Sequence, residues 1–84
     1  MKYKLIFKRN AKKGLMKVPQ KQVRLVVQKI KMLQESPFLG KKLMGGFTGF
    51  YSLRVWPYRI IYTVYKKELL VIIVSIGHRQ GVYK

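Results

Sequence analysis

The chain has 84 residues, with 19 lysines and arginines against two acidic residues, a single histidine and no cysteine. Because carboxylates, imidazoles and thiols are so scarce, the composition excludes paired-carboxylate catalysis, ordinary metal sites and disulfide bonds. The net charge of +17 favours an anionic partner: a nucleic acid, an acidic protein or, with least support, an anionic membrane surface.

The first half of the chain predicts a strand followed by two helices. Residues 3–8 place an apolar side chain at every second position, which is the pattern of a half-buried strand. Asn10 is suited to cap a short helix that ends near residue 17. Pro19 suits the start of a second helix, because apolar residues then recur at helical spacing over residues 20–35. The two helices are expected to form a hairpin that lies on a sheet.

The second half predicts a loop and three strands. Residues 38–49 contain several glycines but lack the Gly-Lys-Ser/Thr ending of a phosphate-binding loop, so a plain loop is expected. Strands follow at residues 50–56, 58–65 and 69–76, and their short connections require antiparallel pairing. The last of them is apolar on both faces and is expected inside the sheet. The predicted fold is α+β, in the order β-α-α-β-β-β, with the helical hairpin packed on a twisted antiparallel sheet in one domain over residues 1–84.

The connection between the first two of these three strands consists of Trp56 and Pro57. The commonest two-residue hairpin turns need φ > 0, which proline cannot adopt. Two interpretations are therefore open: a type VI turn with a cis Pro57, or a longer and looser loop.

A hairpin centred on this turn places Arg54 directly opposite Arg59. Like charges at opposed positions destabilise a sheet by about 0.2–1 kcal/mol. The pair therefore suggests an anion held between the two side chains, with extension of both into solvent as the alternative. Ser52 and Trp56 share the side of the strand on which Arg54 lies. A hydroxyl, a guanidinium and an aromatic plane together suit a phosphate with a stacked base beside it.

The last predicted strand is followed by a short polar ending that contains His78, Arg79 and Tyr83. Taken alone, His78 indicates a structural or exposed residue, and Arg79 is ordinary in so basic a chain. Tyr83 is close to the terminus, where side chains commonly fray. A histidine does titrate in the range useful for proton transfer, so His78 is also a candidate for that step.

Two segments carry a family resemblance. Residues 49–62 read Gly-Phe-Tyr-Ser-Leu-Arg-Val-Trp-Pro-Tyr-Arg-Ile-Ile-Tyr, and residues 76–83 read Ile-Gly-His-Arg-Gln-Gly-Val-Tyr. They resemble the Tyr-x-Leu-Arg-Val…Tyr-Arg-Ile-Ile-Tyr hairpin and the Gly-His-Arg-x-x-Val-Tyr ending of the RelE/ParE toxin superfamily, most closely its RelE branch. Residues 33–37 and 42–45 also fit the helix end and the following loop of that family. The resemblance covers nearly the whole chain.

The resemblance implies the toxin of a type II toxin–antitoxin system. Such a toxin is a cytoplasmic endoribonuclease that cuts mRNA on the ribosome by metal-independent attack of the 2′-OH, and an acidic, RelB-like antitoxin holds it inactive. By position, Arg54 and Arg59 match basic residues that bind and stabilise the scissile phosphate. Arg79 matches an arginine that stabilises the transition state or protonates the leaving group, and Tyr83 matches a tyrosine that orients or stacks on the substrate.

Four further residues are expected to contact RNA: Ser52, Trp56, Lys41 and Lys42. Ser52 departs from the family pattern, because well-known RelE members carry a basic residue at this position, and this departure lowers the expected activity. Two alternatives are therefore kept. One is a ParE-like toxin that inhibits DNA gyrase by binding, without nuclease activity, and the other is a catalytically weak RNA-binding relative.

No cofactor, metal ion or membrane contact is expected. The longest apolar run, residues 69–77, is about half the length of a membrane span. The N-terminus alternates basic and apolar residues and lacks the apolar region of a signal peptide. The cytoplasm is therefore the expected location.

Overall fold

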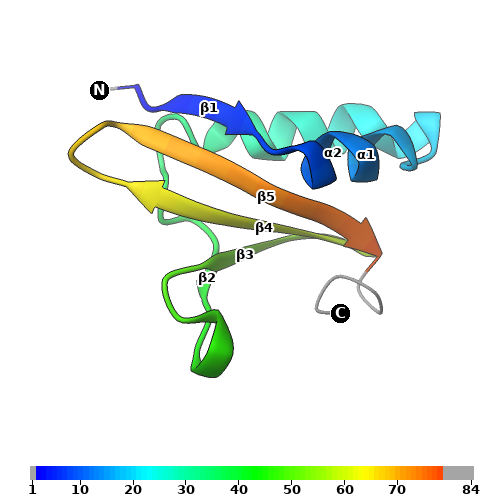
Figure 1. Ribbon diagram of the computed structural model, residues 1–84. Coiled ribbons are helices and arrows are strands. Elements are labelled where there is room, and N and C mark those ends of the chain that lie inside the picture. Colours follow the sequence, from blue (N-terminus) through cyan, green and yellow to red (C-terminus); the bar gives the residue numbers. More distant parts are fainter. Residues whose placement is uncertain (1, 79–84) are drawn as a thin grey trace.

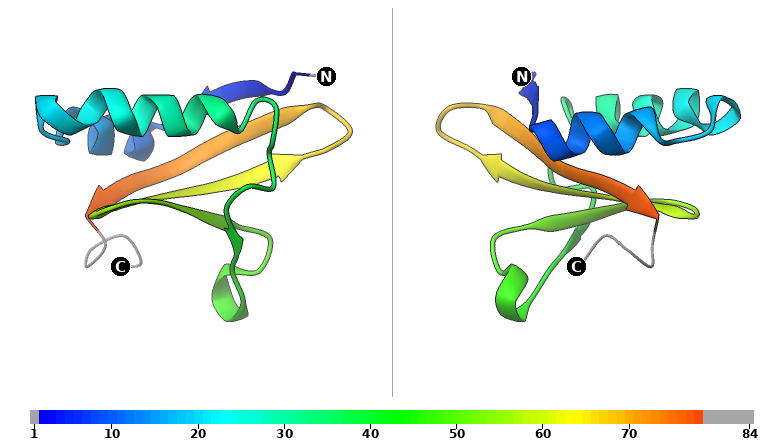
Figure 2. Two further views of the ribbon diagram at one scale, coloured as in Figure 1. Left: turned by 180° about the vertical axis from the view of Figure 1, so that it is seen from behind. Right: turned by 45° about the vertical axis from the view of Figure 1, so that its right-hand side comes forward.

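A five-stranded sheet carries two helices on one face, as Figures 1 and 2 show. The computed structural model describes residues 2–78. The elements follow the predicted order, with a short strand and a 3₁₀ helix added where a plain loop was expected. In chain order they are β1 (Lys4–Phe7), α1 (Arg9–Met16), α2 (Gln20–Met32), β2 (Lys41–Lys42), η1 (Gly45–Phe47), β3 (Tyr51–Val55), β4 (Tyr58–Tyr65) and β5 (Leu70–His78).

The strands lie in the order β1-β5-β4-β3-β2, so β5 is interior, as predicted. The three long strands β3, β4 and β5 pair antiparallel, and the α+β class with a helical hairpin on the sheet is confirmed. The sheet is nevertheless mixed, because β1 pairs with β5 in parallel. The helical hairpin and the segment after it carry the chain from β1, at one edge of the sheet, to β2, at the other, and β1 and β5 run in the same direction.

The core lies between the sheet and the helices. Val26 and Ile30 of α2 meet Ile60 of β4 and Ile73 of β5, and each of these side chains is at most 1% exposed. They come from the apolar stripe of the helix and from alternate positions of the strands, which is the pattern that the sequence predicted. Full burial of each such side chain contributes about 1.5–3 kcal/mol.

The first helix begins earlier than predicted and approaches β5 closely. Its N-cap is Lys8, so the prediction of Asn10 as the cap is wrong. Lys8 follows the end of β1, and its backbone amide donates to the Ile73 carbonyl of β5. Further along α1, a Cβ built on Gly14 would overlap the backbone carbonyl oxygen of Ile76. Only glycine therefore permits this packing of α1 on the strand.

The β3–β4 turn is tight. Val55 pairs with Tyr58, and the peptide bond between Trp56 and Pro57 is cis, which agrees with the first of the two interpretations of this turn. A turn of two residues sets the register of the whole hairpin.

The second face of the sheet carries neither α1 nor α2, although the short η1 lies on that side, and it is called the helix-free face below (Figure 2). Within residues 2–78, neither helix is long and apolar enough to span a membrane.

Candidate anion-binding site

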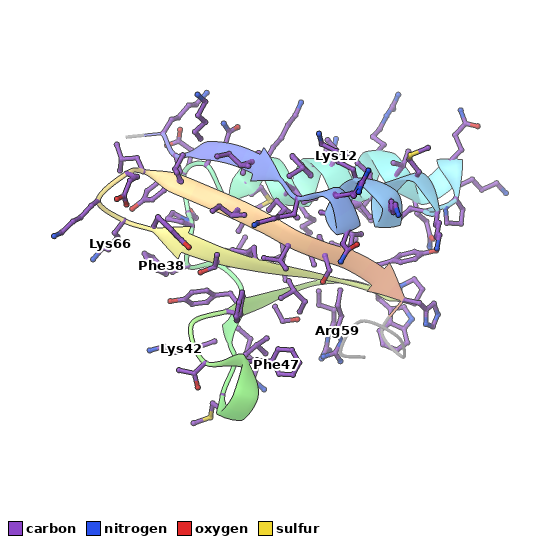
Figure 3. The ribbon with its side chains drawn as sticks, viewed as in Figure 1. Lys12, Phe38, Lys42, Phe47, Arg59 and Lys66 are labelled. Carbon is purple, nitrogen blue, oxygen red and sulfur yellow. The ribbon has the colours of Figure 1, made fainter. Side chains whose placement is uncertain are left out.

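Two arginines project together from the helix-free face. Arg54 of β3 and Arg59 of β4 are directly opposed in the hairpin, as the sequence predicted. Their strand neighbours Leu53, Val55 and Ile60 are buried against the helices, so the alternation of the strands turns both guanidinium groups to the other side. Figure 3 shows Arg59 on the side of the sheet opposite the helices. We call Arg54 and Arg59 the arginine pair.

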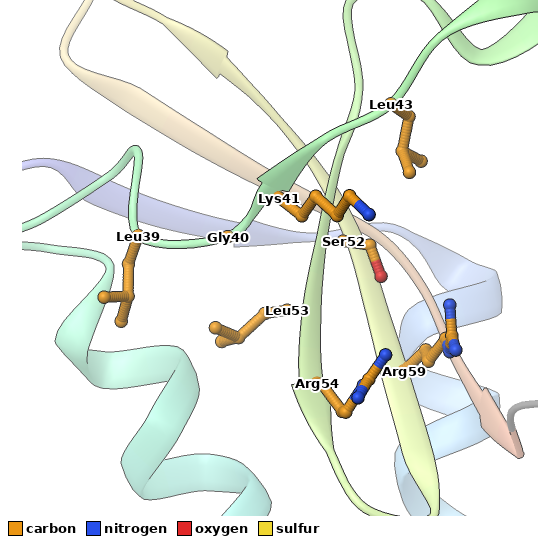
Figure 4. A pocket seen from close by; sticks show the side chains of 8 residues that line it. All are labelled: Leu39, Gly40, Lys41, Leu43, Ser52, Leu53, Arg54 and Arg59. Atoms are coloured by element: carbon orange, nitrogen blue, oxygen red, sulfur yellow. The ribbon is translucent and has the colours of Figure 1, made fainter.

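The arginine pair lines an open pocket of about 500 Å³, which we call the anion pocket (Figure 4). The pocket reaches the edge of the sheet, where Lys41 of β2 pairs with Ser52 of β3. Lys41 and Ser52 therefore lie next to the arginine pair although they come from different strands. The lining consists of Leu39, Gly40, Lys41, Leu43, Ser52, Leu53, Arg54 and Arg59.

Charge and burial both favour an anion in this pocket. Of the described residues that line it, none is acidic, whereas three are basic. Arg54 is exposed, Arg59 is half-buried with its Nε atom inside the protein, and Ser52 is only 8% exposed. A partly buried guanidinium interacts more strongly with an anion than one in bulk water, because the effective dielectric constant is lower. Its planar donor fork also matches the oxygens of a phosphate.

A hydrogen bond holds the outer wall of the anion pocket in place. The backbone amide of Gly40 donates to the hydroxyl of Tyr62 at 2.8 Å. A Cβ built on Gly40 would lie 2.7 Å from that hydroxyl and 2.9 Å from the Ser52 carbonyl oxygen, so there is no room for a side chain. Tyr62 is fully buried and stacks on Tyr51, with ring centroids 5.4 Å apart. Burial raises the pKa of the Tyr62 phenol above its ordinary value of 10.0, although the Gly40 hydrogen bond acts in the opposite direction.

Two of the predicted RNA contacts lie outside the anion pocket. Lys42 pairs with Tyr51 and is the neighbour of Lys41, so its side chain points to the other face of the sheet. Trp56 is 60% exposed at the hairpin turn, beyond the last pair of the ladder.

His78 is not brought to the arginine pair. It pairs with Tyr58, and the two rings make an edge-to-face contact with centroids 6.0 Å apart. Tyr58 packs against the core on the helix-bearing face, so His78 lies on that face too. Arg79 and Tyr83, the other two predicted site residues from this end of the chain, lie outside the described residues.

The family of the chain follows from a comparison with family models. A model described as the ParE toxin of the type II toxin–antitoxin system parDE matches residues 5–83. The chain belongs to this family. It is a toxin of the RelE/ParE superfamily, as its resemblance implied.

Solved structures share the fold over almost the whole length of this toxin. The toxin–antitoxin complex RelBE2 from Mycobacterium tuberculosis is 28% identical with a TM-score of 0.85, over 94% of this chain and 100% of that one. The archaeal RelE–RelB complex from Pyrococcus horikoshii OT3 is 27% identical with a TM-score of 0.79, over 96% and 99%. The YoeB/ParE toxin from Agrobacterium tumefaciens, 18% identical over 89% and 96% with a TM-score of 0.77, shares the fold alone. A comparison with curated proteins found no match.

Sequence reasoning missed the residues that shape the pocket of this toxin. Leu39, Gly40 and Leu43 lie in a segment for which the sequence predicts a plain loop, and the sequence indicates Tyr62 only as part of the hairpin motif. The contact between Gly40 and Tyr62 joins residues 22 positions apart, and no local spacing indicates it. The described part of the chain contains no group of three or more histidine or acidic side chains that would hold a metal ion.

Proposed function

We propose that this toxin is an endoribonuclease that cleaves messenger RNA on the ribosome without a metal ion and so inhibits translation. The observation that supports the proposal is the arginine pair, which presents two opposed guanidinium groups in a pocket without an acidic described residue. Opposed like charges destabilise the free protein, and a phosphodiester bound between them would offset this cost. A ribosome-bound target also implies that the toxin acts in the cytoplasm.

RNA carries its own nucleophile, which makes a metal-independent reaction chemically consistent. The 2′-OH gives its proton to a water molecule and attacks the adjacent phosphorus, the new P–O bond gives a 2′,3′-cyclic phosphate, and the bond to the 5′ oxygen breaks as that oxygen takes up a proton. Arg54 and Arg59 stabilise the additional negative charge on the phosphorane oxygens. Guanidinium groups are poor proton carriers because they remain protonated at all ordinary pH values.

The proton steps are assigned by resemblance. Arg79 is proposed to stabilise the transition state or protonate the leaving 5′ oxygen, and Tyr83 to orient or stack on the substrate. His78 remains a weaker candidate for proton transfer, because it lies on the helix-bearing face. The ribosome is proposed to align the mRNA, so that a toxin with few proton-transfer groups is still effective.

The charge of the remaining chain suits two macromolecular partners. Of the 19 basic residues, 13 lie within residues 1–46, and most of these are outside the anion pocket. They are proposed to contact ribosomal RNA phosphates, which makes binding fall steeply with salt. An acidic, RelB-like antitoxin is proposed to neutralise part of the same surface.

Induced expression in bacterial cells, followed by mapping of mRNA 5′ ends, tests the proposal. The wild type is expected to create new 5′ ends within translated regions. Arg54→Ala and Arg59→Ala are each expected to lower cleavage by about 100-fold, because each removes a group that stabilises the transition state. Arg79→Ala is expected to abolish growth inhibition without loss of fold.

Arg24→Ala is the matched control, because Arg24 is an exposed arginine of α2 outside the anion pocket. It is expected to cleave as the wild type does. Growth arrest by the wild type without new 5′ ends would contradict the nuclease proposal, and so would full activity of the variants at Arg54 and Arg59.

The family model supports a second candidate, a toxin that inhibits DNA gyrase by binding, because that model is described as the ParE toxin. Gyrase inhibition predicts DNA breaks with intact mRNA in the same cells, and it requires no arginine pair. Unselective RNA binding with neither outcome would instead indicate a catalytically weak RNA-binding relative.

A further inference from the structure

A second pocket lies mainly on the helix-free face and reaches around β5 to Asn10, at the start of α1. It has a volume of about 310 Å³, and its lining combines aromatic, aliphatic and polar side chains. We call it the aromatic pocket. Two phenylalanines, Phe47 and Phe50, form part of the lining, together with the polar residues Asn10 and Ser75. Its volume is at the lower end of the range for small-ligand sites, so it is suited to a single ring system.

The strand register places the aromatic pocket next to the arginine pair. Ile61, which lines the aromatic pocket, pairs with Ser52, which lines the anion pocket. Ile61 is two residues from Arg59 on the same face of β4, which corresponds to about 7 Å. Gly77, opposite Arg59 on β5, adds no side chain next to Arg59. A ligand with its phosphate at the arginine pair can therefore place its neighbouring group in the aromatic pocket.

The segment that carries the phenylalanines is an ordered part of the fold. Gly45 and Gly49 have φ values of 66° and 95°, which favour glycine, and they close the segment on either side of Phe47. The Thr63 hydroxyl of β4 donates to the Gly49 carbonyl at 2.9 Å, which fastens the segment to the sheet. Phe47 is 38% exposed and lies with Arg59 on the side of the sheet away from the helices (Figure 3).

We propose that the aromatic pocket binds one RNA base, next to the phosphate held by the arginine pair. The proposal rests on the proposed function and adds the subsite that recognises the nucleotide. Stacking on Phe47 supplies binding to any base. The side-chain amide of Asn10 offers both a donor and an acceptor, a combination suited to hydrogen bonding with the edge of a base.

Binding of uncleavable single strands tests the proposal. The probes are 2′-O-methyl hexanucleotides of adenosine or uridine, and an abasic strand of the same length and charge, with fluorescence anisotropy as the measurement. The wild type is expected to bind the adenosine strand at least tenfold more tightly than the abasic strand. Phe47→Ala is expected to remove this difference while leaving abasic binding unchanged. Asn10→Ala is expected to weaken the binding of both base-bearing strands and to retain stacking.

Two further variants keep the interpretation specific. Phe47→Leu preserves an apolar side chain of similar size without the aromatic face, and it is expected to behave as Phe47→Ala does. Tyr65→Ala removes an exposed aromatic ring of β4 outside both pockets and is expected to bind as the wild type does.

The results separate this proposal from the nuclease proposal. Equal binding of base-bearing and abasic strands by the wild type would overturn the base pocket alone. If both Phe47 variants still preferred base-bearing strands over the abasic strand, the base pocket would also be overturned. The aromatic pocket would then hold a protein side chain instead of a base. Failure of the wild type to bind any of the strands would also overturn the base pocket, whereas the nuclease proposal is decided by the mapping of mRNA 5′ ends in cells.

Discussion

The backbone amide of Gly40 donates a 2.8 Å hydrogen bond to the hydroxyl of Tyr62, which joins the edge of the anion pocket to the buried core. Lys41 follows Gly40 directly in the chain. The ring of Tyr62 stacks on the ring of Tyr51. The position of a basic side chain on one face of the sheet is therefore set by an aromatic residue on the other.

Substitution of Gly40 is expected to destabilise the fold. In Gly40→Ala the new Cβ meets both the Tyr62 hydroxyl and the Ser52 backbone, so the chain must shift, at a cost of about 1–3 kcal/mol in the free energy of unfolding. Urea denaturation measures this cost. Gly46→Ala is the control, because a Cβ there meets no atom within 4 Å, and a change within about 0.5 kcal/mol is expected. Equal effects of the two substitutions would show that the Gly40 contact is not tight.

The Tyr62 phenol is expected to make stability depend on alkaline pH. Burial raises its pKa above 10.0, so the folded chain retains the proton to a higher pH than the unfolded chain. The associated stability is fully present below about pH 10 and is lost as pH rises through the folded pKa. Tyr62→Phe removes this loss, but it costs about 1–2 kcal/mol at neutral pH because the Gly40 amide loses its acceptor.

Urea unfolding at pH 8 and pH 11 compares the two proteins. The free energy of unfolding of the wild type is expected to fall more between these pH values than that of Tyr62→Phe. Tyr65→Phe, at an exposed position, is expected to follow the wild type. An identical pH dependence of all three proteins would contradict the role assigned to Tyr62.

Lys41 and Ser52 are expected to be functionally exchangeable. Because they are directly opposed, Lys41 of β2 supplies a positive charge beside Ser52 of β3, the position at which the family resemblance leads us to expect a basic residue. Lys41→Ala is expected to lower mRNA cleavage about tenfold, and Ser52→Lys in the same chain is expected to restore most of it. Lys42→Ala is the control, because its side chain points to the other face. Failure of the double variant to recover would show that the charge is not interchangeable between the strands.

The salt dependence of RNA binding is expected to report the phosphate contact of Arg54. For single strands, the slope of log K against log salt is about −0.7 for each phosphate neutralised. Arg54→Ala is therefore expected to make the slope shallower by about 0.7, measured with an uncleavable 2′-O-methyl strand. Arg24→Ala retains the anion pocket and is expected to keep the wild-type slope. A slope that Arg54→Ala leaves unchanged would place this side chain away from the phosphate.

The opposition of Arg54 and Arg59 was predictable because a two-residue turn and the two-residue period of a strand leave one register. The face on which His78 lies was not predictable. The β4–β5 ladder pairs Tyr62 with Ile73 but Ile61 with Ser75, so one extra residue of β5 shifts the register between them. Such a bulge reverses the faces of all later side chains, and nothing in the run of aliphatic residues indicates its position.

The strand at this edge of the sheet, β2, could not be predicted from the sequence either. Strand β2 contains only two residues, and both are lysines, which have little intrinsic preference for a strand. The pairing of Lys41 with Ser52 arises from the tertiary contacts of the preceding segment, in particular the Gly40 hydrogen bond.

The close approach of α1 to β5 at Gly14 sets the distance between this helix and the part of the sheet that carries the arginine pair. Ile76, whose carbonyl lies against Gly14, pairs with Ile60, and Ile60 is the neighbour of Arg59. Any larger residue at Gly14 would lift the helix and tilt the strand ends that carry the guanidinium groups. Selection for survivors of toxin expression should therefore recover changes at Gly14, a position on the opposite side of the molecule that never meets the substrate.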